Sequence, residues 1–192
     1  MTSPLRLLAL LGLGLVTACS PAGSASGIEL GALAGGRLRP LELAPGDLRV
    51  IVFITHDCPI ANAYAPELNR LADSYGEQGV ELLLVHTEKG VETQLLEEHA
   101  ADHGLRAEVA LDPEHRLVDA LGAKVTPEAF VLQGEDGGFA LRYAGRIDDR
   151  NVAFGKKRLV AGQHDLRKAL DALLAGELPA VERTEAVGCY IE

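Results

Sequence analysis

Apolar residues occur along this chain in two alternating patterns, continuous runs and segments with a period of three to four residues. Interrupted only by Arg49 and Glu81, residues 48–54 and 80–85 are apolar runs, which are typical of strands buried on both faces of a sheet. Between them, apolar residues from Ile60 to Tyr75 recur with helical spacing, and glycines follow at positions 76 and 79. The pattern predicts a strand, an amphipathic helix and a second strand, in that order.

The remaining pattern continues this alternation. It predicts further strands at residues 41–43, 107–111, 129–132 and 139–143, and further helices at residues 91–103, 115–121 and 165–174. Glycines between the last two strands supply the turn of a hairpin. Strands connected through helices pair in parallel and hairpin strands pair antiparallel. The sequence therefore predicts an α/β fold with a mixed central sheet and helices on both faces.

The first 18 residues have the pattern of a signal peptide, with Arg6 as the only charge and an apolar core at 7–16 that is too short to span a bilayer. The junction Val16-Thr17-Ala18-Cys19 resembles the lipobox of bacterial lipoproteins, in which the cysteine is acylated and becomes the mature N-terminus. An ordinary secretory signal cut near Ala18 or Ala22 is the alternative. Both predict export, and the first predicts a lipid anchor on Cys19 that holds the protein in the bacterial envelope, facing the periplasm.

This leader sets the predicted domain organisation. Residues 1–18 are the signal peptide, and residues 19–36 hold the acylated cysteine and a tether whose first part is small and flexible. Residues 37–176 are long enough for one domain with a core. Residues 177–192 are expected to form an irregular tail that carries Cys189.

The mature chain is acidic, since removal of the leader with Arg6 leaves 17 basic and 28 acidic residues and a formal charge of −11. The acidic residues are scattered among the helices rather than gathered in one tail. Nucleic acid and anionic lipid headgroups are therefore not expected as partners, so the predicted contact with a membrane is through the N-terminal lipid alone. No organic cofactor is implied.

Cys58 stands where a predicted strand ends and a predicted helix begins. A thiolate at a helix N-terminus is stabilised by the unpaired backbone N–H groups, which lowers its pKa and favours a reactive thiol. The polar neighbours His56 and Asp57 predict that this end is exposed to solvent, although a buried structural cysteine is the alternative. The residue three positions on is Ala61, so the site has no second cysteine nearby.

Two short motifs carry a resemblance to a known family. Cys58-Pro59 matches the reactive-cysteine position of the thioredoxin fold, and Val125-Thr126-Pro127 resembles its cis-proline loop. Over residues 40–175 the chain resembles the redoxin branch, which contains the alkyl hydroperoxide reductase and thiol-specific antioxidant proteins. The resemblance implies a three-layer thioredoxin-like sandwich in which Pro127 and Thr126 face Cys58. Thr55 corresponds to the threonine of the peroxiredoxin Thr-x-x-Cys motif, while Ile51 replaces the proline that precedes it in peroxiredoxins.

The same resemblance suggests roles for three charged residues. Tyr143-Ala144-Gly145-Arg146-Ile147-Asp148-Asp149-Arg150 is similar to a segment of exported redoxin-domain proteins. Arg146 or Arg150 could lower the pKa of a thiolate and polarise a peroxide bond, or could form ordinary ion pairs with Asp148 or Asp149. Glu128, next to the cis-proline, is a candidate proton acceptor.

Cys189 and His56 leave alternatives open. Cys189 could be a resolving cysteine that closes a reversible disulfide with Cys58, or it could form a structural disulfide that holds the tail on the domain. His56 could lie in solvent, stabilise the Cys58 thiolate, or join Cys58 in holding Cu(I) or Zn(II). The metal site is the weaker hypothesis because Asn62 replaces the second cysteine of thioredoxin-fold copper chaperones.

Together these features predict an exported thiol oxidoreductase with a redox-active cysteine. Its expected substrate is a thiol or disulfide protein, or a peroxide that it would reduce as an antioxidant. The expected catalytic residues are Cys58, Thr55, Pro127 and Cys189. The alternative is a non-catalytic binding module of the same fold, or a copper-handling protein.

Overall fold

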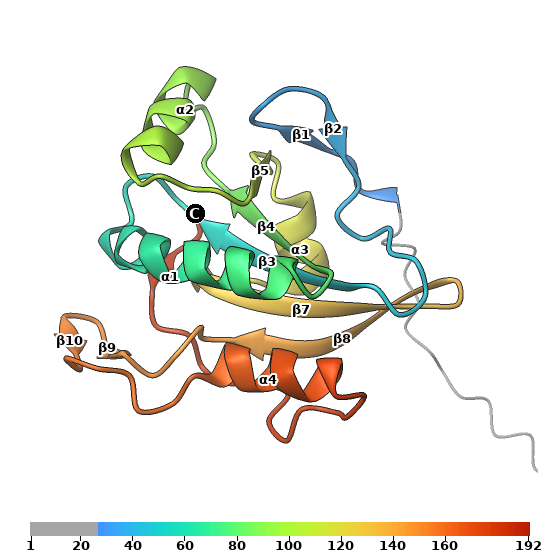
Figure 1. The fold of residues 1–192 in the computed structure, drawn as a ribbon. Coiled ribbons are helices and arrows are strands. Elements are labelled where there is room, and N and C mark those ends of the chain that lie inside the picture. The colour runs from blue at the N-terminus through green and yellow to red at the C-terminus, as the bar shows by residue number, and fades with distance from the viewer. Residues whose placement is uncertain (1–26) are drawn as a thin grey trace, which may run out of the picture.

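The computed structural model describes residues 27–192, and the signal peptide, Cys19 and the first part of the predicted tether lie outside this range. A sheet of seven strands forms the centre of the domain, in the order β2-β1-β5-β4-β3-β7-β8 (Figure 1). Its strands are β1 (Leu30–Ala32), β2 (Arg37–Leu38), β3 (Leu48–Ile54), β4 (Val80–His86), β5 (Glu108–Leu111), β7 (Glu128–Glu135) and β8 (Gly138–Gly145). The helices are α1 (Pro59–Gly76), α2 (Thr93–Asp102), α3 (Arg116–Leu121) and α4 (Asp165–Leu174).

The pairing of these strands confirms the predicted mixed sheet. Strand β3 pairs in parallel with β4, and β4 pairs in parallel with β5. On the other side of β3, strand β7 is antiparallel to it and β8 is antiparallel to β7. The strands that α1 and α2 connect are therefore the parallel ones, while β7 and β8 form the predicted hairpin.

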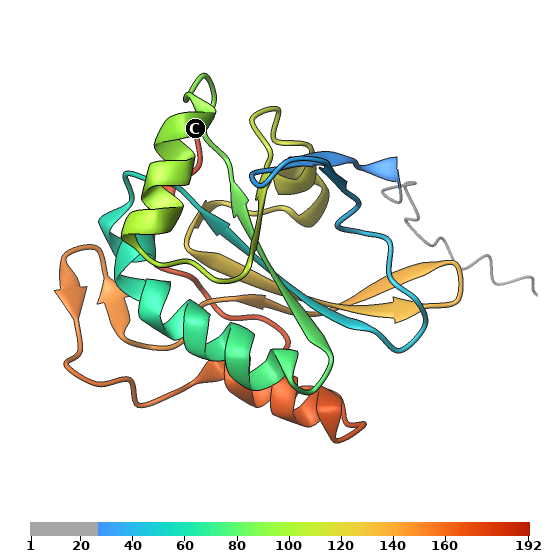
Figure 2. The same cartoon turned by 45° about the horizontal axis from the view of Figure 1, so that its top comes forward.

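Strand β3 separates two cores because its successive side chains point to opposite faces of the sheet. Val50 and Val52 pack in the core that contains the apolar faces of α1 and α4. Ile51 and Phe53 pack in the core that contains α3. All four side chains are buried, which explains why this strand is a continuous apolar run. Helices cover both faces of the sheet, as the sequence predicts (Figure 2).

Residues 41–43 form no strand in the structure, so that prediction is wrong. Pro40 and Pro45 flank this segment and have no N–H to donate to a strand ladder. Leu41 is instead buried against the core that contains α3, and the chain then turns, with Asp47 accepting a hydrogen bond from the backbone of Ala44 at 3.1 Å. The two leucines at positions 41 and 43 fit the alternating strand pattern, but the segment forms a packed loop.

Several short strands have no clear apolar pattern and were not predicted. Strand β1 lies within the segment expected to be tether and pairs antiparallel with β5, so the packed domain begins before residue 37. Strands β9 (Asn151–Ala153) and β10 (Lys156–Lys157) form a hairpin that stands away from the sheet in both views (Figures 1 and 2). The tail is also not irregular throughout, because β11 (Cys189–Tyr190) pairs antiparallel with β6 (Val125–Thr126). Within residues 27–192, no helix is long and apolar enough to cross a membrane.

Candidate active site

Cys58 is the N-cap of α1, directly after the turn that follows β3. Its backbone is extended, and its sulfur accepts a hydrogen bond from the N–H of Ala61 at 3.4 Å, as an N-cap side chain does. Pro59 follows at the start of the helix, where its missing N–H costs no hydrogen bond. The predicted position of the thiol at a helix N-terminus is therefore what the structure shows.

The sulfur of Cys58 is not exposed, contrary to the expectation from its polar neighbours. The residue is 1% exposed because the C-terminal tail crosses above it. Cys189 lies opposite Thr126 in the β11–β6 pair, and its Sγ is 2.7 Å from the Sγ of Cys58. Both cysteines are free thiols in the structure. Two residues 131 positions apart thus bring their sulfurs into contact.

The predicted cis-proline loop forms the other wall of this site. The Thr126-Pro127 peptide bond is cis, and the thiol of Cys58 donates to the carbonyl oxygen of Thr126 at 3.1 Å. The hydroxyl of Thr55 lies 3.3 Å from the hydroxyl of Thr126 rather than on the Cys58 sulfur. Thr55 therefore joins the end of β3 to the cis-proline loop, and Thr126 contacts Cys58 through its backbone.

The tail is held closely against this loop. The N–H of Ile191 donates to the carbonyl of Lys124 at 3.1 Å, which extends the β11–β6 pair by one residue. A Cβ at Gly188 would overlap the carbonyl oxygen of Thr126, so only glycine lets the tail approach this closely. Gly188 and Cys189 together form the cover over Cys58.

The two thiols have different acidities. Burial raises the pKa of Cys58, but hydrogen bonds to its sulfur from Cys189 and from the N–H of Ala61 outweigh burial and lower the pKa overall. Burial raises the pKa of Cys189, and its hydrogen bond to Cys58 raises it further. Cys58 is therefore the more acidic thiol of the pair.

Glu88, at the end of β4, fixes the turn that precedes Cys58. Its carboxylate accepts hydrogen bonds from the backbone N–H of His56, from Nδ1 of His56 at 3.0 Å and from Nδ1 of His86 at 2.9 Å. Burial alone would raise the pKa of Glu88, but the hydrogen bond and charge of His86 and the hydrogen bonds from His56 lower it to about 2. His56 therefore turns its Nδ1 to Glu88, and the predicted pair of His56 with Cys58 is not what the structure displays.

These residues define a different candidate cation site. Ligand atoms of His56, Asp57 and Glu88 lie within 4.8 Å of one another, and Cys58 is not part of the group. One imidazole and two carboxylates suit a divalent cation better than Cu(I), which prefers thiolate ligands. If an ion is held near this site, these are the residues that could hold it.

We expect the stabilising effect of Glu88 to depend on pH. Its pKa in the folded protein lies below the usual value of 4.5, so its contribution is fully present above pH 4.5 and is lost as the pH falls to about 2. Urea unfolding should show wild type more stable than Glu88→Gln by about 3 kcal/mol at pH 7, with the difference shrinking below pH 4.5. Glu97→Gln, an exposed carboxyl on α2, is the control. A difference that stays constant between pH 7 and pH 2.5 would contradict this role.

Asn62 on α1 is a second residue that the sequence did not single out for this role. Its amide donates to the carbonyl of His56 at 2.8 Å, and its Oδ1 lies 2.8 Å from Nε2 of His99. Burial lowers the pKa of His99 to about 4, so the neutral ring donates to Asn62 at neutral pH. The polar run at the end of a buried strand, His86-Thr87-Glu88, was the only sequence signal for this cluster.

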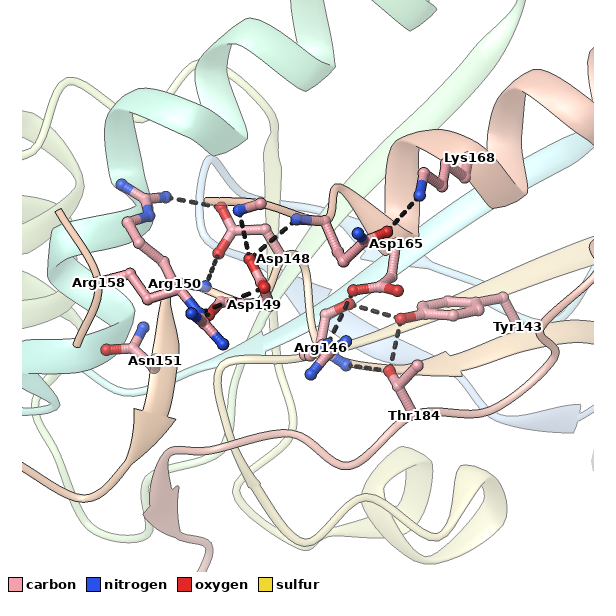
Figure 3. Close-up of polar contacts among 12 residues, drawn as sticks. Tyr143, Arg146, Asp148, Asp149, Arg150, Asn151, Arg158, Asp165, Lys168 and Thr184 are labelled. Atoms are coloured by element: carbon pink, nitrogen blue, oxygen red, sulfur yellow. Dashed lines mark hydrogen bonds and ion pairs between the residues drawn. The ribbon is translucent and has the colours of Figure 1, made fainter. Parts of the chain in front are cut away.

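The charged candidates after β8 have other partners (Figure 3). Arg146 donates to Asp165 at 2.7 Å, and Arg150 donates to Asp148 at 3.1 Å. Glu128 accepts a hydrogen bond from the backbone of Lys124 at 2.8 Å and so supports the approach to the cis-proline loop. For Arg150 the structure shows the ion pair with Asp148 that the sequence left as an alternative.

Two hollows lie beside the tail strand. One, of about 670 Å³, is lined by Cys189 together with residues of the His56 turn and of the β4 end. The other, of about 550 Å³, lies on the side of Arg146 and the β9–β10 hairpin. Phe154, Gly188 and Tyr190 border both hollows. Of the two cysteines, Cys189 lines an open space and Cys58 does not.

Comparison with known proteins places this geometry in context. The model of the AhpC/TSA family matches residues 25–152. No curated protein matches the chain. Among solved structures, an uncharacterised conserved protein from Geobacillus kaustophilus is similar with a TM-score of 0.72 and 22% identity, covering 86% of this chain and 87% of that one. A hypothetical protein from Sinorhizobium meliloti has a TM-score of 0.70 and 21% identity, with 85% and 89% covered.

A secreted Mycobacterium tuberculosis disulfide oxidoreductase, described as homologous to Escherichia coli DsbE, is similar with a TM-score of 0.52 and 15% identity. The similarity covers 81% of this chain and 99% of that one. At these identities the solved structures show the fold alone. They confirm the thioredoxin-like fold class that the sequence predicts.

Proposed function

This chain belongs to the AhpC/TSA family and is a thiol oxidoreductase, and from that premise we propose that Cys58 and Cys189 are its redox couple, on a protein anchored in the bacterial envelope. The observation that carries the proposal is the contact of the two sulfurs at 2.7 Å, beneath a tail strand paired to the cis-proline loop. The export leader and the lipobox-like Cys19 support the envelope location.

The proposed reaction is thiol–disulfide exchange. When the tail moves aside, the Cys58 thiolate attacks a substrate disulfide, forms a mixed disulfide and releases one substrate thiolate, which takes up a proton. Cys189 then loses its proton and attacks the Cys58 sulfur, which closes the Cys58–Cys189 disulfide and releases the second substrate thiol. Two electrons pass from the couple to the substrate, and an external dithiol returns them.

Peroxide reduction by the same couple is less well supported. It would pass through a sulfenic acid on Cys58 that Cys189 converts to the disulfide with loss of water. However, the hydroxyl of Thr55 is engaged with Thr126, and Arg146 and Arg150 are engaged with carboxylates. These contacts favour disulfide exchange, with Pro127 and Thr126 as the backbone wall against which the substrate lies.

A cation-binding role is the second candidate, favoured by the group of His56, Asp57 and Glu88. The sequence left a binding module or metal-handling protein as the alternative, with Cys58 and His56 as the expected ligands. The group in the structure keeps His56 but has Asp57 and Glu88 in place of Cys58. Stoichiometric Zn(II) or Cu(II) binding that Glu88→Gln abolishes and Cys58→Ser leaves intact would support it.

The couple can be tested by mapping the disulfide. We expect diamide to convert the reduced mature protein to a form with one Cys58–Cys189 disulfide, visible as two thiols protected from maleimide, and dithiothreitol to reverse it. Cys58→Ser and Cys189→Ser should each abolish the protection, while Cys19→Ser should not. A midpoint potential above about −250 mV would match a catalytic couple, and one below about −300 mV would indicate a structural disulfide. Failure of the two cysteines to cross-link would contradict the proposal.

A further inference from the structure

The β9–β10 hairpin carries apolar side chains that no part of the described chain covers. Phe154 at its turn is 77% exposed, and Leu159 and Val160 just beyond β10 are also exposed. Tyr190 on the tail strand is 81% exposed. Large exposed aromatic residues on a protein surface mark sites of contact with a partner, because burying them on binding is favourable.

These aromatic residues lie at the redox couple. Phe154 and Tyr190 border both hollows beside the tail, including the hollow that Cys189 lines. A segment that enters that hollow to reach Cys189 would therefore lie beside Phe154 and Tyr190. This surface, formed by Phe154, Tyr190 and the hairpin, is called the hairpin surface below.

The hairpin surface is basic, although the whole chain has a formal charge of −10. Lys156, Lys157 and Arg158 follow one another along the hairpin, and all three are exposed. Arg158 is paired with Asp149 at 3.3 Å, whereas within residues 27–192 no carboxylate forms an ion pair with Lys156 or Lys157. Two unpaired positive charges on an acidic protein attract acidic partners and repel basic ones.

We propose that the hairpin surface docks the dithiol partner that reduces the Cys58–Cys189 disulfide, and that this partner presents acidic residues beside its cysteines. The inference rests on the proposed function and identifies the partner of the same site. One partner thiolate attacks the sulfur of Cys189, the cysteine that lines the hollow, and displaces Cys58, whose lowered pKa makes it the better leaving group. The second partner thiolate closes the partner's disulfide and releases Cys189, so two electrons and two protons pass to the couple.

Two features bound this proposal. The lining of the Cys189 hollow carries Asp57, Glu88 and Glu192 against the single lysine Lys89, so the attraction for acidic residues arises mainly from the hairpin and should weaken when its lysines are replaced. A basic and apolar hairpin could also contact an anionic membrane. The position of Phe154 at the Cys189 hollow favours a redox partner over a membrane.

The test compares how fast three reductants open the disulfide in the oxidised mature protein. Two synthetic peptides share one dithiol core and differ only in flanking glutamates or lysines, and dithiothreitol is the small neutral reductant. Rates are measured by maleimide quenching at 20 and 500 mM NaCl. We expect the acidic peptide to react about tenfold faster than the basic one at low salt, with the difference lost at high salt. The double variant Lys156→Glu/Lys157→Glu should reverse this preference, and Phe154→Ala should slow both peptides, while dithiothreitol reacts as with wild type.

The matched control is Arg37→Glu/Arg106→Glu, which makes the same charge change at exposed arginines on β2 and before β5. The docking proposal would be overturned if wild type reacted equally fast with the two peptides. It would also be overturned if the two double variants changed the peptide preference equally. In both cases dithiothreitol would still reduce the Cys58–Cys189 disulfide. Binding to phosphatidylglycerol vesicles without peptide discrimination would also overturn it and would assign the surface to a membrane. If no Cys58–Cys189 disulfide forms at all, the proposed function fails first.

Discussion

Gly188→Ala should release the tail and raise the alkylation rate of Cys58 about 100-fold in the reduced protein. A Cβ at this position would overlap the carbonyl oxygen of Thr126, and because the backbone fixes the positions of both atoms, no side-chain rotation can relieve the overlap. Loss of the β11–β6 pair would cost the covered state about 2–3 kcal/mol, which corresponds to a 30- to 150-fold larger open population. Because Cys58 is 1% exposed, its alkylation reports that population directly.

The measurement is iodoacetamide labelling at pH 7 followed by mass spectrometry of the Cys58 peptide. Gly138→Ala is the matched control, since a Cβ there meets no atom within 4 Å and that glycine lies in the β7–β8 hairpin, away from the tail. Gly188→Ala should also form the Cys58–Cys189 disulfide more slowly, because the released tail no longer holds its thiol against Cys58. A Cys58 labelling rate within threefold of wild type would show that β11 does not limit access.

Most of the fold could be predicted because each long element has its own apolar period. The apolar residues of the run that forms β3 are buried, and so are Tyr64, Leu68, Leu71 and Tyr75 of the period that predicts α1. Helix α4 begins and ends at the predicted residues. The short strands could not be predicted in this way. Strand β1 has only three residues and β11 only two, too few to show a period, and each is defined by its pairing with a strand distant in sequence.

The site was predictable to the extent that it depends on local chain geometry. The helix N-terminus at Cys58 and the cis Thr126-Pro127 bond follow from motifs of a few residues. Whether Cys58 is exposed depends instead on Cys189, which is 131 positions away in a segment without periodic pattern. Polar neighbours indicated an exposed strand end, but the tail supplies the cover, and the sequence signal for that was a single glycine before Cys189.

The role of Glu88 shows the same limit. It lies 32 positions from His56, and only the parallel pairing of β3 and β4 brings the ends of the two strands together. The sequence placed His56 near the thiol correctly but could not identify which group its ring would contact. Carboxylates at the ends of neighbouring parallel strands are therefore worth examining whenever a reactive residue follows one of them.

Asp148→Ala should destabilise the domain by about 3–5 kcal/mol, because it removes one partner of a buried charged network. Asp148 is 3% exposed and accepts a hydrogen bond from the Tyr64 hydroxyl at 2.5 Å. It also accepts one from the side chain of Arg150 at 3.1 Å (Figure 3). The guanidinium of Arg150 also lies over the Tyr64 ring, 4.5 Å from its centre. Without the carboxylate, the Tyr64 hydroxyl and the Arg150 charge would lose their acceptor in a site with little access to water.

The effect can be separated from simple loss of packing by a double-mutant cycle with Tyr64→Phe. Urea unfolding should give a coupling energy of about 1–3 kcal/mol between the two positions, and Asp148→Asn should cost less than Asp148→Ala because the amide oxygen still accepts one hydrogen bond. Asp119→Ala, at an exposed position on α3, should change stability by no more than about 0.5 kcal/mol. Additive effects of Asp148→Ala and Tyr64→Phe would show that the pair is not coupled. A coupled pair would mean that the segment after β8 is locked onto α1, the helix whose first turn holds Cys58.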